Sequence, residues 1–243
     1  MALKKFYIGT SGWSYPWNPA KTLEWYVLNS GLNAIELNYS FYKFPAKTSV
    51  SSWADSGKNL SWSIKVNRFI THVLRFNQKS RRPMSDFIDI FRELEPRINN
   101  YLFQLPPNMK EDKKDSIVEL IEDVGLKRKA VIEPRDASWF NHDVFDYFKR
   151  NRLTFCSIDS PANRSIIKTT DKIYLRMHGR RRWYDYDYSQ SEIDAVCGEI
   201  KKAKPRQSFA FFNNDRWMLK NAVLMKNLFR RQRVFGRSNA NCS

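Results

Sequence analysis

The feature that most constrains the fold is a series of short apolar segments, spaced fairly evenly along the chain and separated by segments with helical periodicity. Most are continuously apolar, which is typical of parallel strands beneath a layer of helices. The eight predicted strands begin at Lys5, Asn33, Ser61, Asn100, Lys129, Leu153, Lys172 and Gln207. Eight such repeats predict a single α/β domain with a closed (β/α)8 barrel of the TIM type. A doubly wound open sheet has the same local pattern and stays open as an alternative.

The length of 243 residues suits one domain of this kind, and we predict a barrel over residues 1–229 followed by a basic tail over residues 230–243. Hydrophobic residues make up 42% of the chain and aromatic residues 15%, which indicates a folded globular protein. No apolar run approaches the roughly 18 residues that a membrane-spanning helix needs, so no membrane is expected among the partners. A monomer is favoured, although the sequence does not determine the oligomeric state.

The first residues show no export signal, since two lysines lead directly into a strand-like pattern that ends in glycines. The three cysteines, Cys156, Cys197 and Cys242, are odd in number and lack CxxC spacing. This spacing argues against both a disulfide framework and a thiolate zinc site. We therefore expect a cytoplasmic protein.

The formal net charge of +17 is the clearest signal in the composition, because so much self-repulsion contributes nothing to folding. Basic residues concentrate late, at Arg180 to Arg182 and from Lys201 to Arg237, a stretch in which Asp215 is the single acidic residue. This excess predicts an anionic partner, either a nucleic acid or a phosphate-containing molecule. A basic surface that contacts only solvent is the alternative.

Polar residues follow the predicted strands, as in the segment KAVIEPRDASW, which passes from an apolar run to Glu133, Arg135 and Trp139. In a barrel the carboxyl ends of all strands meet at one mouth, where the active sites of such barrels lie. We expect proton transfer by Glu36, Glu133, Asp159 and His178, and substrate binding by Lys65, Arg135, Arg176, Asn38, Gln104, Asn213, Trp13, Tyr42 and Trp139. Polar residues that only satisfy one another at strand ends are the alternative.

A second set of candidates lies just after His178, where the segment RRRWYDYDY mixes cations with aromatic rings. Guanidinium groups bind phosphates and rings stack on bases, as on surfaces that bind single strands. We therefore expect a surface for single-stranded or distorted DNA or RNA, formed by Arg180, Arg181, Arg182, Trp183 and Tyr184. The alternative is a solvated basic loop whose rings pack on the rim of the barrel.

Several motifs occur in order along the chain: IGTSGWSYPW, AIELNYSFYKFP, SIKVNRFITH, FQLPP, IEPRDASW, YLRMHG and FFNND. Together they resemble the YecE-like proteins, family 72 of the domains of unknown function. The resemblance implies a TIM-type barrel, distantly similar in form to endonuclease IV and to xylose-isomerase-like barrels, with no established family activity. The polar positions that recur in the family carry over to Glu36, Asn38, Lys65, Gln104, Glu133, Arg135, Asp159, Arg176, His178 and Asn213. In the first motif, Asn18 to Ala20 replace the family's usual glycine, so this loop can sit differently.

The likeness to endonuclease IV suggests a trinuclear zinc site, but three histidines are too few for one. A single divalent ion on Glu36, Glu133, Asp159 and His178 is chemically possible, yet the expected cations in the same ring oppose it. We therefore predict no metal and no cofactor.

The leading functional prediction is an enzyme of the hydrolase type that acts on an anionic, phosphate-containing substrate, with nucleic acid among the candidates, by metal-independent acid/base chemistry or hydrolysis. Two alternatives stay open. One is a barrel that binds nucleic acid without turnover, and the other is a single-metal sugar isomerase or epimerase, suggested by fold analogy alone.

Overall fold

The protein is an eight-stranded parallel barrel in a computed structural model that describes residues 5–238, with side chains described over residues 5–230. The strands are β1 (Lys5–Ser11), β2 (Ala34–Leu37), β3 (Ser61–Lys65), β4 (Ile98–Gln104), β5 (Ala130–Glu133), β6 (Thr154–Asp159), β8 (Lys172–Met177) and β9 (Gln207–Phe212). They pair in this order, and β9 pairs with β1 to close the ring. The closure confirms the predicted TIM-type barrel and rules out the open sheet. A two-residue strand, β7 (Arg164–Ser165), pairs antiparallel with the end of β6.

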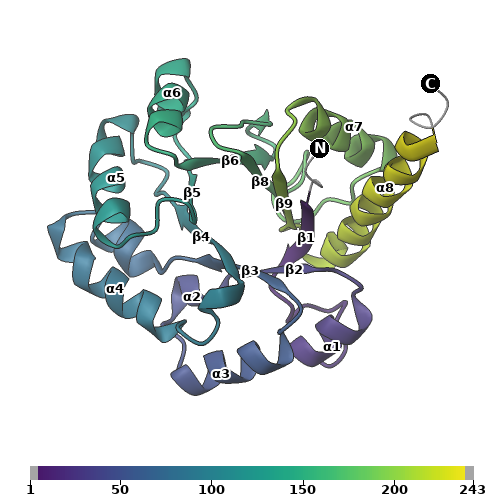
Figure 1. Cartoon of the computed structure of the whole chain (residues 1–243), viewed down its shortest axis with the longest axis horizontal. Helices are drawn as coiled ribbons and strands as arrows, with labels where there is room; N and C mark the ends of the chain where they lie inside the picture. Colours follow the sequence, from purple (N-terminus) through teal and green to yellow (C-terminus); the bar gives the residue numbers. More distant parts are fainter. Residues whose placement is uncertain (1–4, 239–243) are drawn as a thin grey trace.

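Helices surround the ring of strands (Figure 1). They are α1 (Leu23–Asn29), α3 (Lys47–Ser56), α4 (Arg81–Ile90), α5 (Lys114–Asp123), α6 (His142–Arg150), α7 (Gln190–Lys202) and α8 (Met218–Ser238). The short helix α2 (Tyr39–Tyr42) follows β2 directly and contacts β3. Over residues 5–238, no helix has both the length and the apolar character needed to cross a membrane.

Helix α7 illustrates how the sequence sets these elements. The Ser189 hydroxyl accepts a hydrogen bond from the Glu192 amide, and the Glu192 carboxylate accepts one from the Ser189 amide, which forms a capping box. Buried Ile193, Val196 and Ile200 then recur at helical spacing and fix the face that packs on the barrel. Helix α8 continues across the predicted boundary at residue 229 to Ser238, and residues 239–243 of the predicted tail lie outside the described residues.

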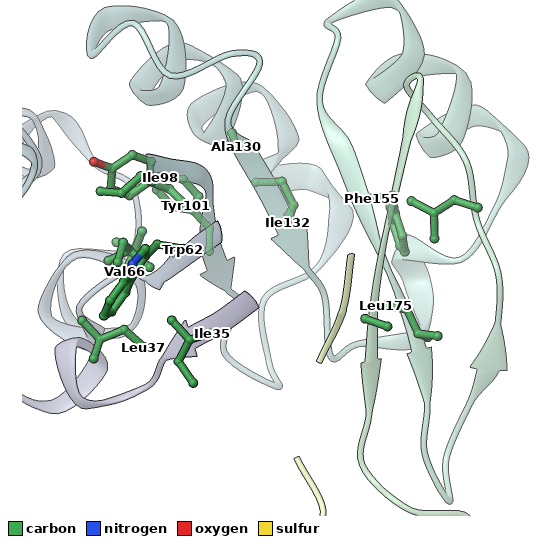
Figure 2. Close-up of a cluster of buried hydrophobic side chains, with 14 of the residues drawn as sticks. Ile35, Leu37, Trp62, Val66, Ile98, Tyr101, Ala130, Ile132, Phe155 and Leu175 are labelled. Atoms are coloured by element: carbon green, nitrogen blue, oxygen red, sulfur yellow. The ribbon is translucent and has the colours of Figure 1, made fainter. Parts of the chain in front are cut away.

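The core has two layers, because side chains alternate between the two faces of each strand. The outer layer fills the space between strands and helices and includes Ile35, Leu37, Trp62, Ile132 and Leu175 (Figure 2). The inner layer lies within the barrel and contains Ala34, Leu102, Val131, Cys156, Ile158, Tyr174, Phe209 and Phe211. Apolar side chains therefore fill the barrel below its mouth.

Strands β1 and β2 approach each other closely at Gly9. A Cβ atom at this position would lie 2.2 Å from the carbonyl oxygen of Ala34, so only glycine fits there without displacing backbone. In the same register, Ser11 lies opposite Glu36. The close approach thus brings the first strand's hydroxyl to the first buried carboxylate of the barrel mouth.

Candidate functional site

A buried guanidinium joins two carboxylates at the carboxyl ends of the strands. Arg176 Nη2 lies 2.7 Å from Glu36 Oε1, and Arg176 Nη1 lies 2.8 Å from Glu133 Oε2. All three side chains have no solvent exposure. Because Glu36, Glu133 and Arg176 come from β2, β5 and β8, this bridge spans the interior of the barrel.

Hydroxyl groups hold the first carboxylate from the other sides. Ser11 Oγ donates to Glu36 Oε1 over 2.6 Å, and Tyr174 Oη donates to Glu36 Oε2 over 2.6 Å. The Ser63 hydroxyl lies 2.6 Å from Tyr174 Oη and extends the chain of hydrogen bonds into β3. Burial, together with the charge of Glu36, holds the pKa of Tyr174 well above its usual range, so the phenol stays a donor. Glu36 is thus fixed in place on both oxygens.

The second carboxylate, Glu133, binds three partners. Besides Arg176, Glu133 contacts Arg135 Nη2 at 2.9 Å and His178 Nε2 at 3.2 Å. Burial alone would raise the pKa of Glu133, but Arg135 and Arg176 hold it well below its usual range. Glu133 is therefore an anion at any physiological pH, and it cannot serve as a general acid.

His178 is a neutral link in the same network. Its pKa is lowered to about 4, chiefly by burial and further by the charge of Arg176. The Asn213 amide lies 3.2 Å from His178 Nδ1, and this contact completes the pairing of the ring. With Nδ1 accepting from Asn213, Nε2–H donates to Glu133. His178 has no exposed surface, and its contact with Glu133 helps to hold that carboxylate in place.

Lys65 differs from these residues because its ammonium group donates no hydrogen bond to any described residue. Its Nζ lies 4.1 Å from the centre of the Phe41 ring, and only 7% of the residue is exposed. The pKa of Lys65 is lowered to about 7, mainly by burial and then by the charge of Arg176. Near neutral pH this amine is therefore present in both its charged and its neutral form, at the edge of the network.

Cations dominate the side of the mouth around Lys65. The pKa of His72 is lowered to about 4 by burial and by the charges of Lys65 and Arg68. The Arg135 Nε group is buried and has no hydrogen-bond partner among the described residues. A buried donor without a partner beside an unpaired amine favours an anionic ligand at this place.

Aromatic side chains form the rim next to the network. A cavity of about 330 Å³ is lined by residues that include Trp13, Tyr15, Asn38 and Tyr42. Burial raises the pKa of Tyr15 to about 12, and the charges of Asp215 and Glu36 add to the effect. The carbonyl oxygen of the Asn38 side chain is buried without a hydrogen-bond partner among the described residues. This cavity offers flat apolar faces with a few polar groups, as small-ligand sites do.

The structure brings most of the predicted residues together at the mouth. The connected network contains Glu36, Glu133, Arg135, Arg176, His178 and Asn213, and Lys65 borders it. Trp13, Asn38 and Tyr42 line the adjoining cavity, and half-buried Gln104 pairs in register with Glu133. The roles assigned to these residues remain predictions.

Asp159 lies apart from this network. Cys156 and Ile158 of β6 belong to the inner layer, so the next side chain points to the other face of the strand. There Asp159 binds Arg180 Nη2 at 2.8 Å and accepts a hydrogen bond from Tyr188 Oη at 2.9 Å. Of the four residues predicted to transfer protons, Glu36, Glu133 and His178 therefore lie together. Asp159 instead anchors the loop after β8.

Trp139 also lies away from the mouth. Its indole is completely buried, and Nε1 donates to the carbonyl oxygen of Met109 over 2.7 Å. The ring packs against Phe148 of α6. It therefore belongs to the outer core, and no face of the ring is open to a substrate.

The predicted nucleic-acid loop contains both paired and exposed residues. Arg180 is held by Asp159 and by Glu192, whereas Arg181 and Arg182 are exposed. Trp183 and Tyr184 are 38% and 39% exposed and lie with ring centres 5.4 Å and 5.7 Å from that of His178. The loop therefore covers His178 and presents two arginines and two rings to solvent.

Tyr174 and Ser63 are site residues that the sequence analysis did not identify. Tyr174 precedes Arg176 by two positions, so both side chains face the barrel interior. This period of two was the available signal. Ser63 likewise precedes Lys65 by two positions, although its contact with Tyr174 forms only when the ring closes.

The donor set for a metal ion does not assemble here. Over the described residues, no three His, Cys, Asp or Glu side chains gather in a way that could hold an ion. Glu36 and Glu133 are bridged by Arg176, and Asp159 faces away from both. The ligands named for a single divalent ion therefore do not converge.

Comparisons with known proteins agree with this geometry. The structure is similar to that of a DUF72 family protein from Thermotoga maritima, at 25% sequence identity and a TM-score of 0.77, over 93% of this chain and 99% of that one. A DUF72 family protein from Enterococcus faecalis is also similar, at 19% identity and a TM-score of 0.77, over 95% of this chain and 99% of that one.

A more distant likeness connects the barrel to isomerase-type proteins. A xylose isomerase domain containing protein from Salmonella typhimurium is 13% identical with a TM-score of 0.55, over 93% of this chain and 95% of that one, which shows a shared fold alone. No curated protein matches the sequence. The family described as protein of unknown function DUF72 matches residues 7–240, and the chain therefore belongs to the DUF72 family.

Proposed function

We propose that the protein is an enzyme that acts on an anionic, phosphate-containing substrate by metal-independent acid/base chemistry, with Lys65 as the proton-transfer group. The observation that carries this proposal is the state of Lys65. Its pKa is lowered to about 7, its ammonium has no hydrogen bond from the described residues, and it borders the mouth. A general base works best when its pKa lies near the working pH.

The other titratable groups are less suited to moving a proton. Glu133 has a pKa well below its usual range and is bound by two guanidinium groups. His178 has a pKa of about 4 and no exposed surface. In this proposal, Glu36, Glu133, Arg176 and His178 form the rigid frame that holds the charge pattern around Lys65.

Arg135 is the anion-binding residue in this proposal. Its side chain is 14% exposed, its Nη2 binds Glu133, and its buried Nε lacks a partner among the described residues. Glu133 thus positions one edge of the guanidinium, and the part of the side chain that is still exposed can contact a phosphate oxygen. The Trp183 ring, 5.2 Å from the Arg135 guanidinium carbon, supports it from a further side.

The adjoining aromatic cavity accounts for the rest of a substrate. A sugar or base attached to the phosphate would stack on Trp13 or Tyr42, and the unpaired Asn38 oxygen would accept a hydrogen bond from a hydroxyl or amino group. Lys65 would then remove a proton from the substrate or from an attacking water. This division of roles assigns binding to Arg135 and the rim, and chemistry to Lys65.

The test incubates the protein with a mixture of sugar phosphates, nucleotides and short oligonucleotides and follows their consumption by mass spectrometry. Lys65→Met should lower any turnover by about 10²-fold or more, the usual contribution of a positioned acid/base group. Arg135→Gln should mainly raise KM. Lys47→Met, at an exposed lysine on α3, is the matched control and should behave as wild type. Turnover that survives Lys65→Met would exclude this role for Lys65.

Binding of single-stranded nucleic acid at the rim is the second candidate function, favoured by the exposed rings of Trp183 and Tyr184 beside Arg181 and Arg182. Since Arg180 is bound by Asp159, the informative variant is Arg181→Ala with Arg182→Ala. In a salt titration of a labelled oligonucleotide, the slope of log affinity against log salt should fall by about 0.7 for each phosphate that the variant no longer neutralises. An unchanged slope would place any nucleic-acid contact elsewhere.

A further inference from the structure

A second cavity, of about 700 Å³, lies at the end of the barrel opposite the mouth. Among its lining residues, Lys172 and Gln207 begin β8 and β9, and Arg128 lies just before β5. Arg176 of the mouth network is four residues further along β8, or about 13 Å at the usual rise of a strand. The cavity is therefore separate from the site described above, and it shares no lining residue with that site.

The walls of this cavity carry an unusual excess of positive charge. Five cationic side chains line it, and Asp171 is the one acidic residue among those lining it; the cations are Arg128, Lys149, Arg152, Lys172 and Arg206. Lys149 is paired with Asp146 at 2.8 Å. Arg128, Arg152 and Arg206 are exposed and form no ion pair with any described residue, so the single carboxylate of Asp171 leaves a net positive charge at this cavity.

The frame of the cavity is rigid. Lys172 Nζ donates to the carbonyl oxygen of Arg128 over 2.7 Å and to Asn100 Oδ1 over 3.2 Å, which fixes the segment before β5. The Thr169 hydroxyl donates to the Leu153 carbonyl oxygen over 2.6 Å. The Arg206 amide donates to the carbonyl oxygen of Asp171 over 2.7 Å. The cations therefore extend from backbone that is already ordered, which lowers the entropy lost when a ligand binds.

We propose that this cavity binds a small ligand that carries two or more linked phosphate groups, such as a nucleoside triphosphate or a short inorganic polyphosphate. Guanidinium groups match phosphate oxygens in pairs, and three exposed ones without an ion pair around one space suit a ligand with several negative charges. The volume falls in the range of small-ligand pockets and exceeds what one phosphate would fill. Both ligands present linked phosphate groups to the arginines. They differ in whether a base and a sugar fill the rest of the cavity.

Isothermal titration at low salt with inorganic tripolyphosphate, and separately with ATP, tests the proposal. The triple variant Arg128→Gln, Arg152→Gln, Arg206→Gln should weaken binding of either probe by at least about 30-fold, since the removal of each charge-assisted hydrogen bond weakens binding several-fold. A matched variant, Lys58→Gln, Arg82→Gln, Arg92→Gln, removes three exposed charges elsewhere and should change affinity by less than about threefold. If both variants weakened binding of the probe equally, only the net charge of the protein would matter, and the proposed site would be wrong.

A mapping experiment identifies the location independently of affinity. Phenylglyoxal modifies accessible arginines, and peptide mass spectrometry reads the extent at each one. A bound probe should protect Arg128, Arg152 and Arg206 and leave Arg82 unprotected; protection confined to Arg135 would place the probe at the mouth and overturn the proposal. ATP binding tighter than tripolyphosphate would assign a nucleoside to the cavity, and the reverse would assign an inorganic chain.

An oligonucleotide separates this proposal from a nucleic-acid surface. If a short oligothymidylate bound more tightly than both small probes, and the cavity triple variant abolished that binding, the site would be a nucleic-acid contact and the small-ligand proposal would fail. Lys65→Met and Arg135→Gln, which test the mouth, should leave probe protection at the three cavity arginines unchanged. Failure at one end of the barrel is thus distinguishable from failure at the other.

Discussion

Arg176 Nη1 lies 2.8 Å from Glu133 Oε2, and neither side chain has any contact with solvent. The same guanidinium reaches Glu36 at 2.7 Å, so one cation neutralises two buried anions from different strands. A charge removed from water so completely is tolerated only when opposite charges lie next to it, as both carboxylates do here. Removal of Arg176 would therefore leave Glu36 and Glu133 as buried carboxylates without their shared counter-charge.

The first prediction concerns this bridge. Arg176→Met should lower the free energy of unfolding by about 3–5 kcal/mol, because it leaves two buried carboxylates without their shared partner. Urea denaturation followed by circular dichroism measures the change. The triple variant Glu36→Gln, Arg176→Met, Glu133→Gln should recover most of the loss. If the triple variant were no more stable than Arg176→Met, uncompensated charge would not be the cause.

The second prediction is that the Lys65 amine reacts at unusually low pH. Its pKa is lowered to about 7 from the ordinary value of 10.5, so half of the Lys65 amines are unprotonated at a pH where an exposed lysine is fully charged. Trace labelling with acetic anhydride at a series of pH values, read peptide by peptide, should give a midpoint near pH 7 for Lys65. Lys47 serves as the exposed reference. Parallel curves for the two lysines would contradict the prediction.

The third prediction is that Lys65→Met stabilises the protein, and does so most at low pH. Between its folded pKa of about 7 and its ordinary value near 10.5, the unfolded chain holds the proton and the folded chain does not. The cost of the buried ammonium is therefore complete below pH 7 and falls as the pH rises toward 10.5. We expect a gain of about 3 kcal/mol at pH 6 and less than half of that at pH 9. A gain that grew with pH would contradict the assigned pKa shift.

The fourth prediction is that His178 stays neutral through the physiological range. Its pKa of about 4, lowered by burial, means that its imidazole signals in NMR spectra should not shift between pH 5 and 8. Below its ordinary pKa near 6.5 the unfolded chain takes up the proton first, so stability should fall as the pH drops from 6.5 toward 4. The His178→Gln variant identifies the His178 signal, because that signal is missing from its spectrum. The same variant should lose less stability between pH 6.5 and pH 4 than the wild type does. A titration near pH 6.5 would show that His178 is solvated.

The fifth prediction concerns Gly179, which precedes the exposed loop. Its φ of +105° is disfavoured for other residues, and a Cβ atom there would lie 2.4 Å from the Arg182 carbonyl oxygen. Gly179→Ala should therefore destabilise the protein by about 1–3 kcal/mol and displace Trp183. Thermal unfolding measures the first effect, and the difference in tryptophan emission with and without a Trp183→Phe substitution measures the second. Gly198→Ala, on α7 with open space around it, is the control and should be close to neutral or stabilising.

The fold could be predicted from the sequence because its signal is local. Apolar runs such as the one ending at Glu133 are visible as strands, and their number favoured a closed barrel over the open sheet that stayed as an alternative. The positions of Glu36, Lys65 and Arg176 at strand ends followed from the same rule. These residues could be predicted from their position along the chain alone, without knowledge of side-chain contacts.

The pairing within the site could not be predicted in the same way. Strand β6 is buried on both faces and carries a small polar residue on each, so the sequence does not reveal that Asp159 points away from the interior. The burial of Trp139 depends on the path of the chain after β5, which no periodicity describes. The lowered pKa of Lys65 results from burial and from the charge of Arg176, a residue of another strand, and is visible only in three dimensions.

The bridge from Glu36 to Arg176 also bears on how the chain is made. The two residues are separated by 140 positions, so a ribosome has exposed the carboxylate of β2 long before its partner in β8 exists. Until then the growing chain holds Glu36 and Glu133 in water, and the half-built ring cannot dehydrate them. Completion of the last strands therefore controls when the mouth can close, which makes biosynthesis of this protein dependent on contacts between distant segments.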